Sequence, residues 1–333
     1  MRWDIFSAQE HVGYPFIDSV PKGAHRPYWS VMIPTYNSDK YLEKTLKSVL
    51  EQDLGPKEMQ IEVVDDCSKK DAPERVVKGI GSGRVRFYRQ PYNVGATQNF
   101  NTCIKRSIGQ IVHILHSDDF VLPGFYKRMK TILRKFPNCG MVASRVLLVD
   151  ARGIELGTSK ALSDSSCILE QYHLRMNTED PIRTPGVVVR RSTYERLGGY
   201  DVRLAHSADW EMWLRISANT PIWYEHDVLA TYRVHPAADT SRFRISGSYI
   251  DEARKTIEIA TRRLQIPNVR EFRTVGLRVY AGVALEEGRS RAVSGDLLGA
   301  ARMVWKGVRC TPTMRTFWRG FRIVARAAKR QYP

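Results

Sequence analysis

The stretch that decides the fold is Ile111-Val112-His113-Ile114-Leu115-His116-Ser117-Asp118-Asp119-Phe120. It begins as a mostly apolar, β-branched run, which is typical of a buried strand, and it ends on two adjacent carboxylates. In an open α/β sheet the carboxyl ends of the strands form the crevice that binds ligands. Asp118 and Asp119 are therefore candidates to hold a divalent cation at a pocket mouth. A solvated turn before Pro123 is the alternative interpretation.

Strands and helices alternate on the amino-terminal side of this stretch. Apolar runs predict strands at 29–33, 61–64 and 85–88, and amphipathic spacing predicts helices at about 38–52 and 73–80 and one ending near residue 107. Short turns with acidic or amide side chains follow two of these strands, at Asp65-Asp66 and at Asn93. This order indicates an α/β protein with a doubly wound, mostly parallel sheet flanked by helices.

The composition is that of an ordinary globular protein. The 333 residues, 43% of them hydrophobic and 26% charged, suffice for one large α/β domain and an accessory region. Five scattered cysteines without a CxxC pair argue against a disulfide framework and a structural zinc site. The N-terminus lacks the apolar core of a secretory signal, and no run of about 18 apolar residues predicts a transmembrane helix. We therefore expect a cytoplasmic protein.

The net charge of +17 is partly local, because residues 297–333 contain nine Lys or Arg and no Asp or Glu. Such an excess attracts nucleic acid, an anionic membrane or phosphorylated ligands. No nucleic-acid module can be recognised in the sequence. A membrane surface and phosphorylated ligands are therefore favoured, and no nucleic-acid partner is expected.

Several short motifs, in a consistent order, resemble the family 2 glycosyltransferases of the GT-A fold. These are Pro34-Thr35-Tyr36-Asn37, Val63-Val64-Asp65-Asp66-Cys67-Ser68, Asn93-Val94-Gly95, Ser117-Asp118-Asp119, Gly198-Gly199-Tyr200-Asp201, the stretch 207–215 and Tyr232-Arg233-Val234-His235-Pro236. The resemblance covers residues 29–240. It implies a GT-A domain with a nucleotide-binding half at 29–120 and an acceptor half at 121–240, between an irregular arm at 1–28 and a helical region at 241–333.

The resemblance implies a nucleotide-sugar donor held at the first two turns. Tyr36, beside Pro34 and Thr35, would stack on the base, and Asp66 would accept a hydrogen bond from a ring imide, which suits UDP- or dTDP-sugars. Asn93 and Gly95 would shape the loop beside the ribose and diphosphate. The alternatives are a packing residue for Tyr36, a helix N-cap for Asp66 and a simple turn at Asn93.

The resemblance also implies a metal and a general base. Asp119 would bind Mg²⁺ or Mn²⁺, Asp118 would face the ribose or sugar, and His235 would be a further metal ligand or diphosphate contact. Asp209 would accept the proton of the acceptor hydroxyl. An ordinary carboxylate at a helix N-terminus is the alternative for Asp209, and Glu211 is an alternative base.

This sequence departs from the family at two positions. Ala208 stands where many members have Glu, which puts a neighbouring acceptor or structural contact in doubt. Ser117 stands where a strict Asp-x-Asp motif would have a carboxylate.

The last third of the chain predicts helices at 249–264, 269–287 and 295–308, of which the last two resemble a tetratricopeptide-type hairpin. Residues 313–330 predict an amphipathic helix with one apolar face and an adjacent basic stripe. The apolar face has Met314, Phe317, Trp318, Phe321 and Val324; the stripe has Arg315, Arg319, Arg322, Arg326 and Lys329. Such a helix fits the surface of an anionic bilayer, or it docks on the core of the protein.

These features together predict an inverting, metal-dependent glycosyltransferase. It would move a sugar from a nucleotide-diphosphate sugar to a glycan or lipid-linked hydroxyl acceptor in surface polysaccharide, lipopolysaccharide or glycolipid assembly. A non-catalytic nucleotide-sugar or anionic-surface binding protein is the main alternative. A nucleotidyltransferase is disfavoured because no glycine-rich, lysine-bearing loop follows the first strand.

Overall fold

The computed structural model describes residues 13–174, 176 and 178–331. It divides into two compact units. The first unit comprises Met1–Tyr172 and Asp180–His235, and the second comprises His173–Glu179 and Pro236–Pro333. Residues 1–12 of the predicted arm lie outside the described residues, and residues 13–28 contain no helix or strand.

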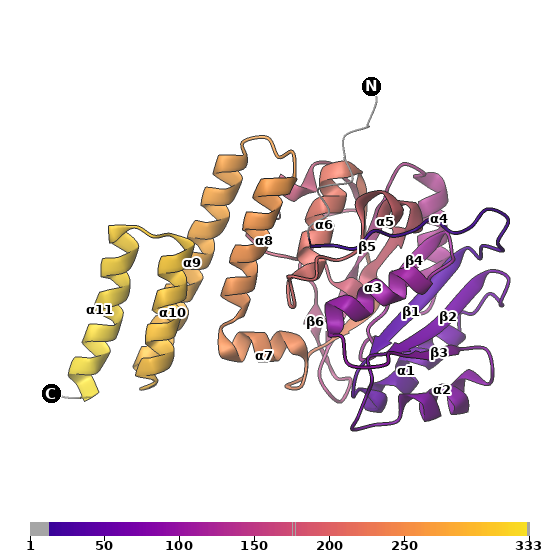
Figure 1. Cartoon of the computed structure of the whole chain (residues 1–333), viewed down its shortest axis with the longest axis horizontal. Coiled ribbons are helices and arrows are strands. Elements are labelled where there is room, and N and C mark those ends of the chain that lie inside the picture. The colour runs from indigo at the N-terminus through magenta and orange to yellow at the C-terminus, as the bar shows by residue number, and fades with distance from the viewer. Residues whose placement is uncertain (1–12, 175, 177, 332–333) are drawn as a thin grey trace. The chain divides into compact units, whose positions relative to one another are not determined.

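Among the described residues, the first unit is built on one nine-stranded mixed sheet with the order β3-β2-β1-β4-β8-β5-β9-β7, in which β6 pairs with β5. Figure 1 labels the strands β1 to β4 of its parallel part. The strands are β1 Trp29–Thr35, β2 Met59–Asp65, β3 Arg86–Arg89, β4 Ile111–Ile114, β5 Met141–Val149, β6 Glu155–Thr158, β7 Cys167–Leu169, β8 Val187–Arg190 and β9 Ile222–Arg233. The first four pair in parallel, and β8 joins β4 to β5 with antiparallel pairing on both sides. The predicted α/β fold is confirmed, and its parallel part is the amino-terminal half.

Within the described residues, the first unit has six α-helices between its strands. They are α1 Asp39–Leu50, α2 Pro73–Gly81, α3 Ala96–Arg106, α4 Phe125–Lys135, α5 Arg191–Leu197 and α6 Ala208–Asn219. Alternate side chains of β1 (Trp29, Val31, Ile33) share one buried apolar cluster with residues of α1, α2 and α4. This burial is the expected result of the period of two in a strand and of the 3.6-residue period in a helix.

The opposite face of the parallel half carries polar side chains beneath α3. Ser30 donates to Gln60 at 2.5 Å, Gln60 donates to Glu62 at 3.2 Å, and Arg106 of α3 pairs with Glu62. Ser30, Gln60 and Glu62 are buried but have hydrogen-bond partners, so their burial costs little, and the pair with Arg106 helps fix how α3 lies across the sheet. The arrangement leaves the carboxyl ends of β1, β2 and β4 side by side at one edge.

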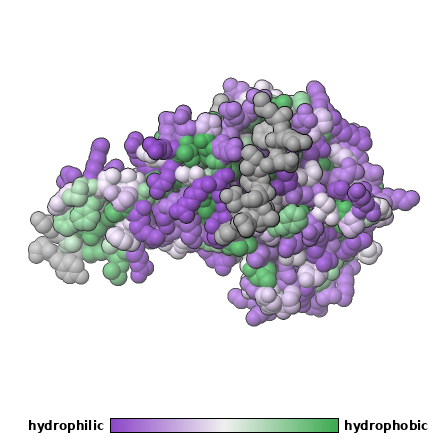
Figure 2. Space-filling model, turned by 45° about the horizontal axis from the view of Figure 1, so that its top comes forward, coloured by the Kyte–Doolittle hydropathy of each residue, from purple (hydrophilic) through white to green (hydrophobic). Residues whose placement is uncertain are grey.

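The second unit is helical. Its helices are α7 Asp239–Ser246, α8 Tyr249–Arg263, α9 Val269–Val293, α10 Leu297–Cys310 and α11 Met314–Gln331. Small residues allow α9 and α10 to approach closely, because a Cβ at Gly288 would lie 3.2 Å from the carbonyl oxygen of Ala300. Several large apolar side chains of α11 stay on the surface (Figure 2). Among the described residues, no helix is long and apolar enough to cross a bilayer.

Candidate active site

The loops after β1 and β2 are tied to each other by hydrogen bonds. The amide oxygen of Asn37, whose φ is 49°, accepts from the backbone N–H groups of Lys69 and Lys70 at 3.0 Å each. The backbone N–H of Asp66 donates to the carbonyl of Thr35 at 2.9 Å. Tyr36, between Thr35 and Asn37 in the sequence, is 45% exposed. An exposed ring on a fixed loop is available to a ligand, which disfavours the packing role considered for Tyr36.

Asp66 closes the loop that follows β3. Its carboxylate accepts from the backbone N–H groups of Val94 at 2.7 Å and Gly95 at 2.9 Å and from the side chain of Asn93 at 3.0 Å. Burial raises the pKa of Asp66, and the two backbone N–H groups act in the opposite direction. Gly95 has a φ of 86° and precedes α3. Asp66, Asn93 and Gly95 are thus brought together, with Asp66 connecting the β2 and β3 loops.

The loop after β4 is fixed by a helix and by the last strand. The hydroxyl of Thr45 in α1 donates to the carbonyls of Ser117 at 2.9 Å and Asp119 at 2.6 Å. The backbone N–H of Arg233, at the end of β9, donates to the Asp119 carboxylate at 2.7 Å. The Arg233 guanidinium also donates to the carbonyl of Asp118 at 2.8 Å. These contacts fix the loop that carries Asp118 and Asp119, whose two carboxylates differ in solvent exposure.

Asp118 is the more accessible of the two carboxylates. Its side chain is 25% exposed and contacts Nε2 of His235 at 3.0 Å, whereas the Asp119 side chain is only 2% exposed. A third candidate ligand, His116, lies with Nδ1 3.8 Å from the Asp119 carboxylate. The ring of His116 stacks on Phe100, with 5.2 Å between the centroids. Among the described residues, its buried Nε2 has no hydrogen-bond partner.

The electrostatics of this cluster favour a cation. Burial and the neighbouring charge of Asp118 raise the pKa of Asp119 well above its usual value. Burial also acts to raise the pKa of Asp118, but the hydrogen bond from His235 and the charges of His116 and His235 bring it below its usual value. Two adjacent carboxylates in a poorly solvated place repel each other, and a bound cation would remove that repulsion.

The donor atoms present fit a divalent metal. A ring nitrogen of His116 and one carboxylate oxygen each of Asp118 and Asp119 lie within 4.8 Å of one another. Carboxylate oxygen suits Mg²⁺ and Mn²⁺, and imidazole nitrogen suits Mn²⁺ better than Mg²⁺. The sequence prediction did not include His116, because a histidine at the end of an apolar strand resembles a core residue.

Asp209 lies in the first turn of α6. Its carboxylate accepts from its neighbour's backbone N–H, that of Trp210, at 2.8 Å and lies 3.4 Å from the hydroxyl of Thr184. Burial of His116 lowers the pKa of its ring, and the negative charges of Asp118 and Asp209 raise it. Asp209 therefore lies within electrostatic reach of the cluster after β4. No sequence motif indicated Thr184.

Glu211 is not available as a base. Its side chain is 2% exposed and pairs with the equally buried Arg215 at 2.7 Å. Arg215 in turn donates to the backbone carbonyls of Gly198 and Gly199. The pair therefore fixes the Gly198–Gly199 turn to α6, which is a structural task.

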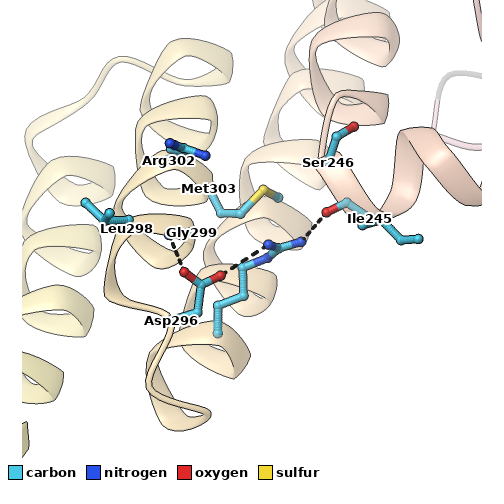
Figure 3. A pocket seen from close by; sticks show the side chains of 8 residues that line it. Ile245, Ser246, Asp296, Leu298, Gly299, Arg302 and Met303 are labelled. Carbon is cyan, nitrogen blue, oxygen red and sulfur yellow. Dashed lines mark hydrogen bonds and ion pairs between the residues drawn. The ribbon is translucent and has the colours of Figure 1, made fainter.

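The described residues of the second unit line a cavity of about 270 Å³, and Figure 3 shows its lining side chains. Its lining consists of Ile245, Ser246, Arg291, Asp296, Leu298, Gly299, Arg302 and Met303. Asp296 caps α10 by accepting from the backbone N–H of Gly299 at 2.8 Å and pairs with Arg291 at 3.4 Å. None of the residues expected to bind the donor or the metal lines this cavity. Of its charged side chains, Arg291 and Asp296 pair with each other.

Comparison with known proteins identifies the first unit. Residues 30–192 match the model of the glycosyl transferase family 2. The chain carries a family 2 glycosyltransferase domain. An uncharacterised protein of Mycobacterium tuberculosis is 29% identical to it over 230 residues, which cover 65% of this chain and 70% of that protein. An uncharacterised glycosyltransferase of Rickettsia typhi is 25% identical over 66% of this chain and 68% of its own.

Solved structures share the fold of the glycosyltransferase domain and its helical extension. Staphylococcus aureus TarS 1-349, solved with UDP-GlcNAc, aligns with a TM-score of 0.65 at 16% identity over 92% of this chain and 93% of that one. The match to a longer TarS structure covers only 50% of that chain. A mannosyltransferase of Pyrobaculum calidifontis with GDP-Man and Mn²⁺ aligns with a TM-score of 0.55 at 16% identity. The likeness establishes the GT-A fold.

Proposed function

We propose that the glycosyltransferase domain transfers a sugar from a nucleotide-diphosphate sugar to a hydroxyl acceptor, with inversion at the anomeric carbon and with a divalent metal. The observation that supports this most is the grouping of Asp118, Asp119, His116 and His235 where β4 and β9 end. The donor residues expected after β1 and β2 lie at the carboxyl ends of these strands; in the sheet β1 is next to β4, and β2 is next to β1. A diphosphate between them would reach both groups.

In this proposal Tyr36 stacks on the base, and Asp66 with Asn93 and Gly95 forms the wall beside the ribose. Because both carboxylate oxygens of Asp66 already accept backbone N–H groups, its main task is to shape this wall, and a base imide would be a further donor to it. Relatives that bind UDP-GlcNAc and GDP-Man leave the choice of base open. A UDP- or dTDP-sugar is our preferred donor.

Asp118 and His235 would hold the metal from the solvent side, with His116 and the deeper Asp119 behind them. This assignment gives Asp118 a more direct part than the sequence suggested, because it is the more exposed carboxylate. The ion would stabilise the negative charge that develops on the leaving diphosphate. Mn²⁺ is favoured over Mg²⁺ because imidazole nitrogens accompany the carboxylates.

Asp209 would act as the general base. The acceptor hydroxyl attacks the anomeric carbon as the bond from that carbon to the diphosphate breaks, and the hydroxyl proton passes to the Asp209 carboxylate. Thr184 contacts this carboxylate and would orient it. The acceptor would be a glycan or lipid-linked intermediate of envelope polysaccharide or glycolipid assembly on the cytoplasmic side of a membrane.

The test is an assay of donor consumption. Purified protein is incubated with UDP-, dTDP- and GDP-sugars, with Mn²⁺ or a chelator, and with lipid and polysaccharide fractions of a bacterial envelope as acceptors. We expect one class of donor to release its nucleoside diphosphate only with metal, together with a labelled glycan product. If the protein binds a nucleotide but consumes no donor with any fraction, it is the non-catalytic binding protein.

A further inference from the structure

The carboxyl-terminal helix α11 leaves several large apolar side chains about half exposed or more. Three of its apolar residues, Phe317, Trp318 and Phe321, are 48, 49 and 53% exposed, and Met314 is 68% exposed. Their spacing of three and four residues places them on one side of the helix, which we call the aromatic face. Trp318 contacts both phenylalanine rings, at 5.9 and 5.6 Å between centroids.

The side of α11 that packs against α10 is a different one. Gly320 and Ala327 are buried, and a Cβ at Gly320 would lie 2.3 Å from the Val304 side chain. At 100° per residue, these positions lie roughly 120° around the helix from the centre of the aromatic face. Small residues therefore make the internal contact, and the large ones remain outside. Within the described residues of its own helical unit, the aromatic face therefore stays about half exposed.

A stripe of arginines runs beside the aromatic face along the same helix. Arg315, Arg319, Arg322 and Arg326 are all exposed. Within the described residues, none of the four pairs with a carboxylate; Arg322 donates only to the carbonyl of Trp318 at 3.3 Å. Residues 297–333 contain no Asp or Glu. The helix thus presents unneutralised positive charge and aromatic rings side by side over its 18 residues, about 27 Å.

We propose that the aromatic face and the arginine stripe of α11 dock on the surface of an anionic lipid bilayer. An apolar face bordered by arginines matches the boundary between acyl chains and anionic headgroups, where aromatic side chains are also favoured. A second copy of the chain is a poorer occupant, because symmetric pairing through α11 would bring two acid-free basic segments together. This surface is separate from the glycosyl transfer proposed above, and each can fail without the other.

The test is sedimentation of the full-length protein with vesicles. One set contains equal phosphatidylcholine and phosphatidylglycerol, and the other contains phosphatidylcholine alone. We expect binding to the mixed vesicles, weakened by salt, and much less to the neutral ones. Replacing Arg315, Arg319 and Arg322 by Gln should lower the partition coefficient roughly 100-fold, since each arginine near such a surface contributes roughly fivefold.

The apolar part of the surface is tested by Phe317→Ser with Trp318→Ser and Phe321→Ser. This variant should lose binding, and the corresponding triple Leu variant should keep it, because Leu remains apolar. The matched charge control replaces the exposed Arg270, Arg273 and Arg278 of α9 by Gln and should bind like the wild type. All substituted residues are exposed, so the variants should fold, which circular dichroism checks.

Three results would overturn the proposal. One is equal binding by the Ser variant and the wild type. Another is equal loss in the α9 control, which would reduce the effect to net charge. The third is a vesicle-free dimer, seen by sedimentation velocity, that the Ser variant abolishes, because a second copy would then occupy the aromatic face.

Discussion

Asp209 is the residue on which the proposed chemistry depends. Asp209→Asn keeps the size of the side chain and an oxygen that can accept from the Trp210 N–H, but amide oxygen is a far weaker base than carboxylate. We expect kcat to fall by about 100- to 10,000-fold while the affinity for donor nucleotide stays unchanged.

The control for this experiment is Asp227→Asn, which removes an exposed carboxylate of β9. It should leave both kcat and nucleotide affinity unchanged. The comparison is made by steady-state kinetics and calorimetry on both variants. If Asp209→Asn retained near-normal kcat, the general base would have to be sought elsewhere, since Glu211 is engaged with Arg215.

The sequence predicted Asp118, Asp119, Asp209 and His235 as candidates, because each stands in a short motif with a chemical reason for its residue type. It could not predict how deeply each of these side chains is buried. Asp119 is buried by the backbone of Arg233, which is 114 residues away along the chain. His116 was overlooked because it ends an apolar run that reads as a core strand. Contacts across such separations follow only from the folded sheet.

At the scale of the element, α6 illustrates how a buried ion pair supports the site. Glu211→Gln leaves the charge of Arg215 buried without its partner, so we expect the free energy of unfolding to fall by about 3 kcal/mol. Glu43→Gln is the matched control, because Glu43 and Lys47 have the same spacing but are both 55% exposed. Its cost should stay below about 0.5 kcal/mol. Chemical denaturation measures both, and equal costs would contradict this account of α6.

Strand β4 contains a buried histidine that makes stability depend on pH. Nδ1 of His113 accepts from the Tyr126 hydroxyl at 3.1 Å, and Nε2 donates to the carbonyl of Pro185 at 3.0 Å. Burial lowers the pKa of His113 from 6.5 to about 3. The unfolded chain therefore binds a proton below about pH 6.5 that the folded protein binds only near pH 3, so stability is lost as the pH falls through this window.

Between about pH 7 and pH 5 this one residue should lower the free energy of unfolding by about 2 kcal/mol. His113→Gln can still donate to Pro185 but does not titrate, so its loss over the same interval should be smaller by that amount. Denaturation curves of both proteins at the two pH values give the difference. An identical pH dependence in wild type and variant would mean that His113 is protonated without unfolding.

The elements from residue 29 to residue 114 were predicted well because most of these strands and helices have a regular apolar pattern. Helix α4 was not predicted, although its buried residues have amphipathic spacing. The position of β8 between β4 and β5 was not predicted, since antiparallel pairing over such distances leaves no local signature. Helix α7 was also missed, as its eight residues show no amphipathic spacing.

At the scale of the whole molecule, two compact units divide the proposed tasks: donor chemistry in the first, and a membrane-facing surface in the second. The sequence indicated an amphipathic helix at 313–330 but not which side packs inward. That depended on Gly320, whose lack of a Cβ lets α11 approach Val304 and leaves the aromatic face outside. The side chains of Lys329 and Arg330 lie outside the described residues.

The central claim is that residues at the ends of β1, β2, β4 and β9 form one metal-dependent site for a nucleoside diphosphate. Isothermal titration of the purified protein with UDP, dTDP and GDP, with and without Mn²⁺, tests it most directly. We predict that one nucleotide binds only when metal is present and that Asp118→Asn abolishes this dependence. Equal affinity with and without metal, or unchanged metal-dependent binding by Asp118→Asn, would contradict the account.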